Sequence, residues 1–157
     1  MLDHVIVTVS DFTRSIAFYE QALKPLGITD LLDYKGQDGH PDLKGFGTDG
    51  RFFFWLKEGR PDPDTVHFGF VAKSHAEVNS FFAAAIAAGG REKTAPAPQL
   101  QYHPDYYATW VLDPDGHDVE VVNKTGQIDL AVGSRWVGPA KLCFGGAKIS
   151  AGPVLFP

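Results

Sequence analysis

The chain has 157 residues, of which 44% are hydrophobic and 21% are charged, and its formal net charge is −5. These values are typical of a soluble globular protein of one domain or two small halves, and the negative charge argues against a nucleic-acid partner. No apolar run approaches the ~20 residues that span a bilayer, and the first residues lack the pattern of a signal peptide. We therefore expect a cytoplasmic protein without a membrane or nucleic-acid partner.

The first predicted strand covers residues 2–9 and alternates between two faces. Its odd-numbered valines form one apolar face, and His4 lies on the opposite face. Ser10 or Asp11 can cap the following helix, which the spacing of apolar residues predicts over residues 12–26.

Three further strands complete the first half. The pattern predicts them over residues 29–34, 43–47 and 51–57, with a hairpin turn at residues 48–50 between the last two. The glycine- and proline-rich residues 59–64 then indicate a linker.

The second half begins with a strand over residues 66–71 and a helix capped by Ser74, with Glu77 as its capping-box partner. The helix ends at the Gly89-Gly90 pair. Strands are then predicted over residues 100–103, 106–112 and 117–122.

The two halves repeat one another. Three kinds of landmark recur 63 to 66 positions apart, namely His4 with His67, Ser10 with Ser74, and Gly50 with Gly116. The repeat predicts an α+β fold of two βαβββ modules, residues 1–58 and 64–123, which form a single domain. We expect a curved eight-stranded mixed sheet around a shared cavity, with the helices on the outside.

Strand parity predicts which side chains face this cavity. His4 and His67 face it from equivalent strands, and Glu120 faces it from the last strand, four residues after Gly116. The residue four positions after Gly50 is Phe54, so Phe54 is expected at the position equivalent to Glu120. Two histidines and one carboxylate are thus predicted to converge.

Three stretches of the chain carry a resemblance to one known family: LDHVIVTVSDFTRSIAFYEQALKPLG, VHFGFVAKSHAEVNSFFAAAIAAGG and ATWVLDPDGHDVEVV. They resemble the vicinal oxygen chelate superfamily, which contains glyoxalase I, extradiol dioxygenases, fosfomycin-resistance proteins and bleomycin-resistance proteins. The resemblance covers residues 1–123. Residues 124–157 lie beyond it and are expected to be a C-terminal extension of unknown role.

The resemblance implies that His4, His67 and Glu120 are metal ligands. Two imidazoles and a carboxylate suit divalent Fe, Mn, Zn or Ni, and no other cofactor is implied. It also implies a homodimer and a metal-dependent enzyme acting on a small oxygen-chelating substrate, by dioxygenase, lyase or isomerase, or epoxide-opening transferase chemistry. Glyoxalase-like members use a further carboxylate as base, and Phe54 cannot abstract a proton.

Further candidates come from the polar and aromatic stretch after residue 100. His103 is a candidate general acid or base, and Tyr107 or Tyr106 is a candidate hydrogen-bond donor to a substrate or metal-bound oxygen, with structural packing as the alternative. His117, beside a tight turn, is expected to be structural. The rival function is metal-free binding or sequestration of a small molecule, as in bleomycin-resistance proteins.

Overall fold

The computed structural model describes residues 2–124, all of which fall in one compact unit. The expected C-terminal extension, apart from Lys124, and the single cysteine, Cys143, lie outside the described residues. The elements in chain order are β1 (Val5–Val9), α1 (Phe12–Ala22), η1 (Lys24–Leu26), β2 (Asp30–Tyr34), β3 (Leu43–Thr48), β4 (Arg51–Glu58), η2 (Pro63–Thr65), β5 (His67–Val71), α2 (His75–Ala87), β6 (Arg91–Pro98), β7 (Tyr106–Leu112) and β8 (Asp118–Lys124).

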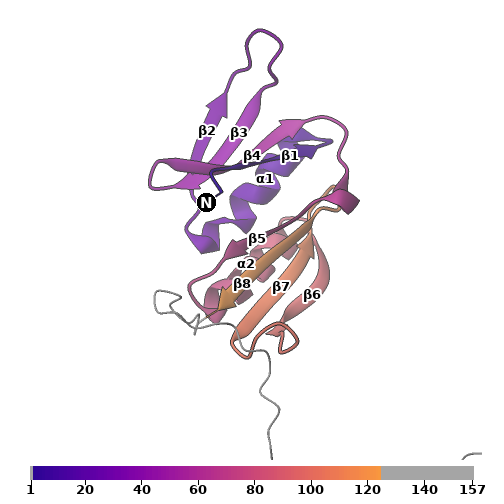
Figure 1. The fold of residues 1–157 in the computed structure, drawn as a ribbon. Coiled ribbons are helices and arrows are strands. Elements are labelled where there is room, and N and C mark those ends of the chain that lie inside the picture. The colour runs from indigo at the N-terminus through magenta and orange to yellow at the C-terminus, as the bar shows by residue number, and fades with distance from the viewer. Residues whose placement is uncertain (1, 125–157) are drawn as a thin grey trace, which may run out of the picture. The chain divides into compact units, whose positions relative to one another are not determined.

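Each module forms its own four-stranded mixed sheet (Figure 1). The strand order is β1-β4-β3-β2 in the first sheet and β5-β8-β7-β6 in the second. The pairs β1–β4 and β5–β8 are parallel, and the other neighbouring pairs are antiparallel. The predicted α+β class and the two βαβββ modules are therefore confirmed, and the eight described strands divide between two sheets that do not close into a barrel.

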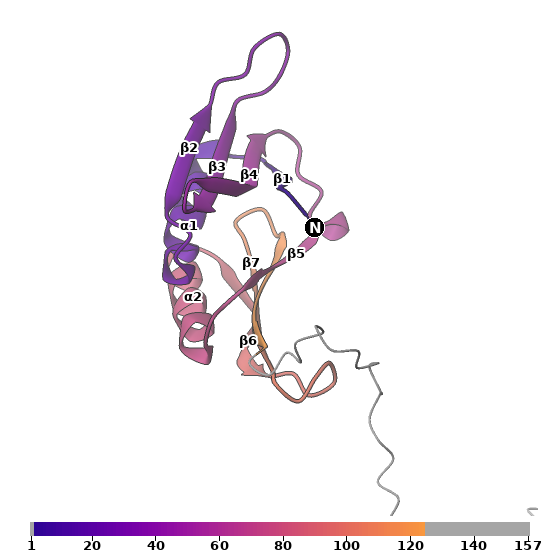
Figure 2. The same ribbon diagram turned by 60° about the vertical axis from the view of Figure 1, so that its left-hand side comes forward.

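The helices cover one side of the molecule. Figure 2 shows α1 and α2 along the same side, where they contact one another, with α2 packed on its own sheet. Asp11 rather than Ser10 caps α1, because its Oδ1 accepts from the amide of Arg14 at 2.9 Å. Ser74 caps α2 as predicted, accepting from the amide of Glu77 at 3.2 Å. No helix among the described residues has the length and apolar character needed to cross a membrane.

Two predicted elements differ from the structure. The first helix ends at Ala22 instead of Leu26, because Pro25 and the left-handed Gly27 (φ 74°) close the chain in the short helix η1. The second strand of the second module is β6, at residues 91–98, whereas residues 100–103 form a turn. The prolines of β6 argued against a strand, but β6 is an edge strand, where proline is tolerated.

Phe54 lies in the hydrophobic core. It is fully buried, and its ring centroid lies 4.8 Å from that of Tyr19 and 5.3 Å from those of both Phe68 and Phe70. Phe54 therefore joins the aromatic cores of the two modules. The prediction that it occupies the position equivalent to Glu120 is wrong.

A β-bulge explains that error. Phe46 pairs with Phe54 and Gly47 pairs with Phe52, so β4 carries one extra residue, Phe53, opposite β3. Ile6 of β1 pairs with Trp55, just as Gly69 of β5 pairs with Glu120. Trp55 is the structural equivalent of Glu120, and it too lacks a carboxylate.

The turn between β7 and β8 joins the second module to α1. The buried carboxylate of Asp113 accepts from the Tyr19 hydroxyl at 2.8 Å, and it contacts Nδ1 of buried His117 at 2.9 Å. Two residues later, Asp115 accepts from the backbone amide of Ser10 at 2.8 Å and from Arg14 at 2.7 Å. His117 is thus structural, as its position beside the turn suggested.

Candidate active site

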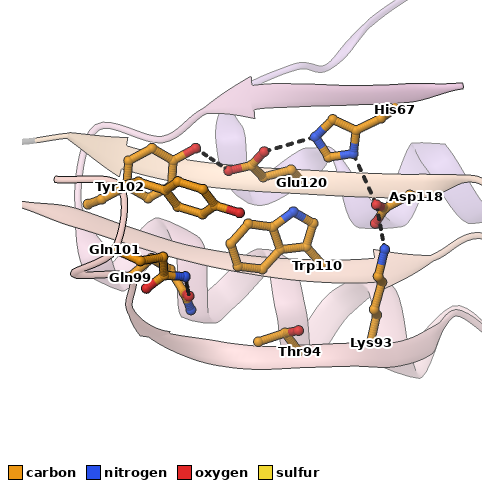
Figure 3. Close-up of a pocket in the computed structure, with 10 residues that line it drawn as sticks. His67, Lys93, Thr94, Gln99, Gln101, Tyr102, Trp110, Asp118 and Glu120 are labelled. Atoms are coloured by element: carbon orange, nitrogen blue, oxygen red, sulfur yellow. Dashed lines mark hydrogen bonds and ion pairs between the residues drawn. The ribbon is translucent and has the colours of Figure 1, made fainter. Parts of the chain in front are cut away.

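The second sheet carries a polar site on the face opposite its helix. Parallel pairing sets His67 beside Asp118 and Gly69 beside Glu120, and antiparallel pairing sets Trp110 beside Glu120. Apart from Gly69, these residues line a cavity of about 530 Å³ together with Lys93, Thr94, Gln99, Gln101, Tyr102 and Tyr106. Figure 3 shows how the labelled side chains gather over the strands.

Five of these residues form a continuous chain of contacts across the sheet. Lys93 Nζ donates to Asp118 Oδ2 at 2.7 Å, and the same oxygen lies 3.0 Å from His67 Nδ1. His67 Nε2 lies 3.1 Å from Glu120 Oε2. The other oxygen of Glu120, Oε1, accepts from the Tyr106 hydroxyl at 2.5 Å.

The imidazole of His67 therefore lies between two carboxylates. A neutral imidazole has one N–H donor, so it can donate to only one of them, and the other contact then joins two acceptors. Asp118 is already paired with the ammonium group of Lys93. Glu120, by contrast, accepts a hydrogen bond from a neutral group, the Tyr106 hydroxyl. Glu120 is only 7% exposed, so a cation beside Oε2, between it and His67 Nε2, would stabilise its carboxylate.

Two atoms of this site have the separation expected of ligands to one ion. Two cis ligands about 2.1 Å from an ion lie roughly 3.0–3.4 Å apart, which includes the observed separation of 3.1 Å. The Asp118 carboxylate on the second nitrogen of His67 is the usual second partner of a metal-binding imidazole. His67 Nε2 and Glu120 Oε2 are therefore the atoms that could hold a metal in this site.

Tyr106 is a neutral phenol that donates a hydrogen bond to Glu120. Burial, followed by the hydrogen bond to Glu120, raises the pKa of Tyr106 well above its usual value. The phenol therefore keeps its proton at neutral pH and continues to donate to Oε1. This leaves Oε2 as the oxygen of Glu120 that is directed toward His67.

The structure places His4 elsewhere. It lies on the open face of the first sheet, in a separate cavity of about 250 Å³ lined also by Asp3, Ile6 and Trp55. Within residues 2–124, no three His, Cys, Asp or Glu side chains are grouped so that they could hold one metal ion. The two modules do share a cavity, of about 840 Å³, which is lined by Phe53 of the first module and by His67 and Phe68 of the second. Neither His4 nor Glu120 lines it, and only two of the three predicted ligands come together in one chain.

The two candidate catalytic residues, His103 and Tyr107, also lie outside the polar cavity. His103 lines a neighbouring cavity with Tyr102, Tyr106 and Lys124, and its Nδ1 accepts from the amide of Asp105 at 3.2 Å. Tyr107 faces the helix side, where its hydroxyl donates to Asn79 at 3.0 Å and its ring stacks on His75. Of the two tyrosines considered, the structure brings Tyr106 to the site.

Sequence reasoning missed Lys93 and the role of Asp118. Asp118 and Glu120 are two positions apart in one predicted strand and so share a face, which means that the proximity of Asp118 to His67 could have been found from the repeat. Lys93 gave no such signal, because its strand was not predicted. It occupies a bulge in β6, shown by the register shift between Glu92 and Thr94.

The comparisons agree with this fold. The chain belongs to the Glyoxalase/Bleomycin resistance protein/Dioxygenase superfamily, whose family model matches residues 1–121. No curated protein matches the chain in a sequence search.

Solved structures give the same result. A glyoxalase/bleomycin resistance protein from Albidiferax ferrireducens T118 is 26% identical, with a TM-score of 0.63, and the match covers 78% of this chain and 98% of that one. The fosfomycin resistance protein FosX from Listeria monocytogenes is 20% identical, with a TM-score of 0.58, covering 80% of this chain and 93% of that one. A FosX mutant was crystallised with Mn(II) and 1S,2S-dihydroxypropylphosphonic acid. At this level of identity, the FosX match shows the fold alone.

Proposed function

We propose that this protein is a metal-dependent enzyme that acts on a small substrate through two neighbouring oxygen atoms. The observation that supports it is the placement of His67 Nε2 and Glu120 Oε2, 3.1 Å apart at the floor of an open polar cavity. A divalent ion there would act as a Lewis acid and stabilise negative charge on the substrate oxygens. The reaction itself stays among the dioxygenase, lyase or isomerase, and epoxide-opening classes.

The chain's own residues supply orientation and shape. Asp118 and Tyr106 hold the outer atoms of His67 and Glu120, so the two inner donor atoms point toward one another. Trp110 and Tyr102 form an aromatic wall, with ring centroids 6.5 Å apart. This wall would bind the apolar part of a substrate beside the polar pair.

We further propose that His4 of a second copy is the third ligand. In one chain His4 lines the open face of the first sheet, where its side chain is 49% exposed and the neighbouring Ile6 is 45% exposed. The His67 side chain is 51% exposed on the open face of the second sheet. In a homodimer that brings these two faces together, His4 would reach the His67–Glu120 pair.

The first experiment is metal analysis. Purified protein is expected to bind one divalent ion per chain, and Mn(II) is the first ion to test because the similar FosX mutant was crystallised with it. His67→Ala is expected to lower the affinity at least tenfold, whereas His40→Ala, in an exposed turn, should leave it unchanged. If the wild-type protein takes up no ion, the enzyme proposal fails.

A second experiment tests the shared site. His4→Ala and His67→Ala homodimers are each expected to bind metal weakly. Refolding the two variants together forms mixed dimers, in which intact His4 of one chain meets intact His67 of the other. One high-affinity site should therefore return in each mixed dimer. If the ligands came from one chain, mixing would restore no sites.

Metal-free binding is the second candidate function. The observation that favours it is the hydrogen-bonding distance between His67 and Glu120, beside an aromatic wall. This candidate requires that a small aromatic ligand raises the melting temperature without turnover and without any added ion.

A further inference from the structure

Asp118 lies beside His67 in the parallel pairing of β5 and β8. Its Oδ2 is 3.0 Å from His67 Nδ1, and its side chain is 20% exposed. Oδ1 is buried and has no hydrogen-bond partner among the described residues. Oδ2 is therefore the oxygen that makes this carboxylate's polar contacts in the described part of the chain.

Lys93 fixes the position of Oδ2. Its Nζ lies 2.7 Å from that oxygen, and the bulge in β6 directs its side chain across the sheet toward β8 (Figure 3). A carboxylate oxygen only accepts hydrogen bonds, and Lys93 already donates to this one. A proton on the facing nitrogen of His67 is therefore required for a favourable contact.

We propose that Asp118 is a positioning residue, which holds the Nδ1–H of His67 and thereby turns Nε2 toward Glu120. The inference rests on the proposed function, because the direction of Nε2 affects metal binding only if Nε2 is a ligand of the ion. Without Asp118, the imidazole can rotate about its side-chain bonds, and it can place its proton on Nε2, where it would donate to Glu120. Either change removes the lone pair of Nε2 from the site.

The test compares Asp118→Ala with Asp118→Asn. Alanine removes the acceptor, whereas the amide oxygen of asparagine can still accept from both His67 and Lys93. Asp42→Ala is the matched control, since it also removes one carboxylate but in an exposed loop of the first module, where Asp42 pairs with Lys35.

Two measurements are needed. In proton NMR of the metal-free protein, the Nδ1–H of His67, assigned with His67→Ala, is expected as a downfield signal protected from exchange with water. Asp118→Ala should lose the signal, and Asp118→Asn and Asp42→Ala should keep it. Titration with Zn²⁺ should show 10- to 100-fold weaker binding for Asp118→Ala, about the loss typical of such outer partners.

The outcomes separate the two proposals. If the wild-type protein binds no Zn²⁺ but the Nδ1–H signal depends on Asp118, the metal proposal fails and the positioning role stands. If Asp118→Ala keeps both the protected signal and the wild-type Zn²⁺ affinity, the positioning role is overturned. An unprotected Nδ1–H in the wild-type protein would also overturn it.

Discussion

At the scale of single residues, the two adjacent tyrosines of β7 have opposite surroundings. The hydroxyl of Tyr106 donates to the nearly buried carboxylate of Glu120, and that of Tyr107 donates to Asn79 at the protein surface. Alternation along the strand is the cause, since successive side chains point to opposite faces. A shift of one residue along β7 is therefore enough to move a tyrosine from the site to the helix side of the sheet.

This contrast predicts different costs for removing each hydroxyl. Tyr106→Phe leaves Oε1 of Glu120 without its donor and is expected to lower the free energy of unfolding by about 1–3 kcal/mol. Tyr107→Phe breaks a more exposed hydrogen bond and should cost about 0.5–1 kcal/mol. Urea denaturation of both variants at pH 7 measures the difference, and equal losses would contradict the assignment.

At the scale of elements, the bulge in β4 determines which side chain lies on the open face of the first sheet. Because Phe53 is the extra residue, Trp55 lies on the open face and Phe54 lies in the core. Gly45 accommodates the indole, since a Cβ on Gly45 would lie 2.7 Å from the Trp55 ring. At equivalent positions, the open face of the first sheet therefore has the indole of Trp55 and that of the second sheet has the carboxylate of Glu120.

We predict that glutamate is tolerated at one of these neighbouring positions and not at the other. Phe54→Glu would bury a charge among four aromatic rings and should cost at least about 4 kcal/mol, enough to prevent stable folding. Trp55→Glu should cost about 1–2 kcal/mol, since its charge can reach solvent. Circular dichroism and urea denaturation distinguish them, and an unfolded Trp55→Glu protein would refute the register.

The elements also show how far the sequence could be interpreted. The period of two in the strands and the offset between His4 and His67 were enough to predict the modules and the proximity of His67 and Glu120. The bulges were not predictable, because an extra residue in a strand leaves the local pattern of apolar residues almost unchanged. They account for the wrong assignment of Phe54 and the missed role of Lys93. The separation of His4 depends on how two sheets pack, which strand parity does not describe.

At the scale of the whole molecule, buried polar groups connect the modules. Burial raises the pKa of Asp113, but hydrogen bonds and charge from His117, with a further hydrogen bond from Tyr19, outweigh it and hold the pKa below its usual value. A carboxyl whose pKa is lower in the folded state stabilises the fold above its unfolded pKa of about 3.9. That contribution is lost as the pH falls from about 4 through the folded pKa.

Tyr19→Phe is therefore expected to weaken both the junction and its response to acid. It removes one hydrogen bond that lowers the pKa of Asp113, so the decline in stability below about pH 4 should be shallower than in the wild-type protein. At pH 7 it should cost about 1 kcal/mol. Tyr34→Phe is the control because Tyr34 is 45% exposed. Urea denaturation from pH 7 to pH 3 gives both quantities, and identical pH profiles would contradict the role of Tyr19.

The contacts of α1 with the distant turn have a consequence for protein synthesis. The Tyr19 hydroxyl and its acceptor on Asp113 are separated by 94 positions, and Ser10 and Asp115 by 105. While the chain emerges from the ribosome, Asp113 is synthesised long after the first helix. For most of that time the buried Tyr19 hydroxyl therefore lacks its hydrogen-bond acceptor. The first module can therefore complete these contacts only after nearly the whole second module has been synthesised. The two halves look independent in sequence because they repeat one another, but the first half depends on the second for these hydrogen bonds.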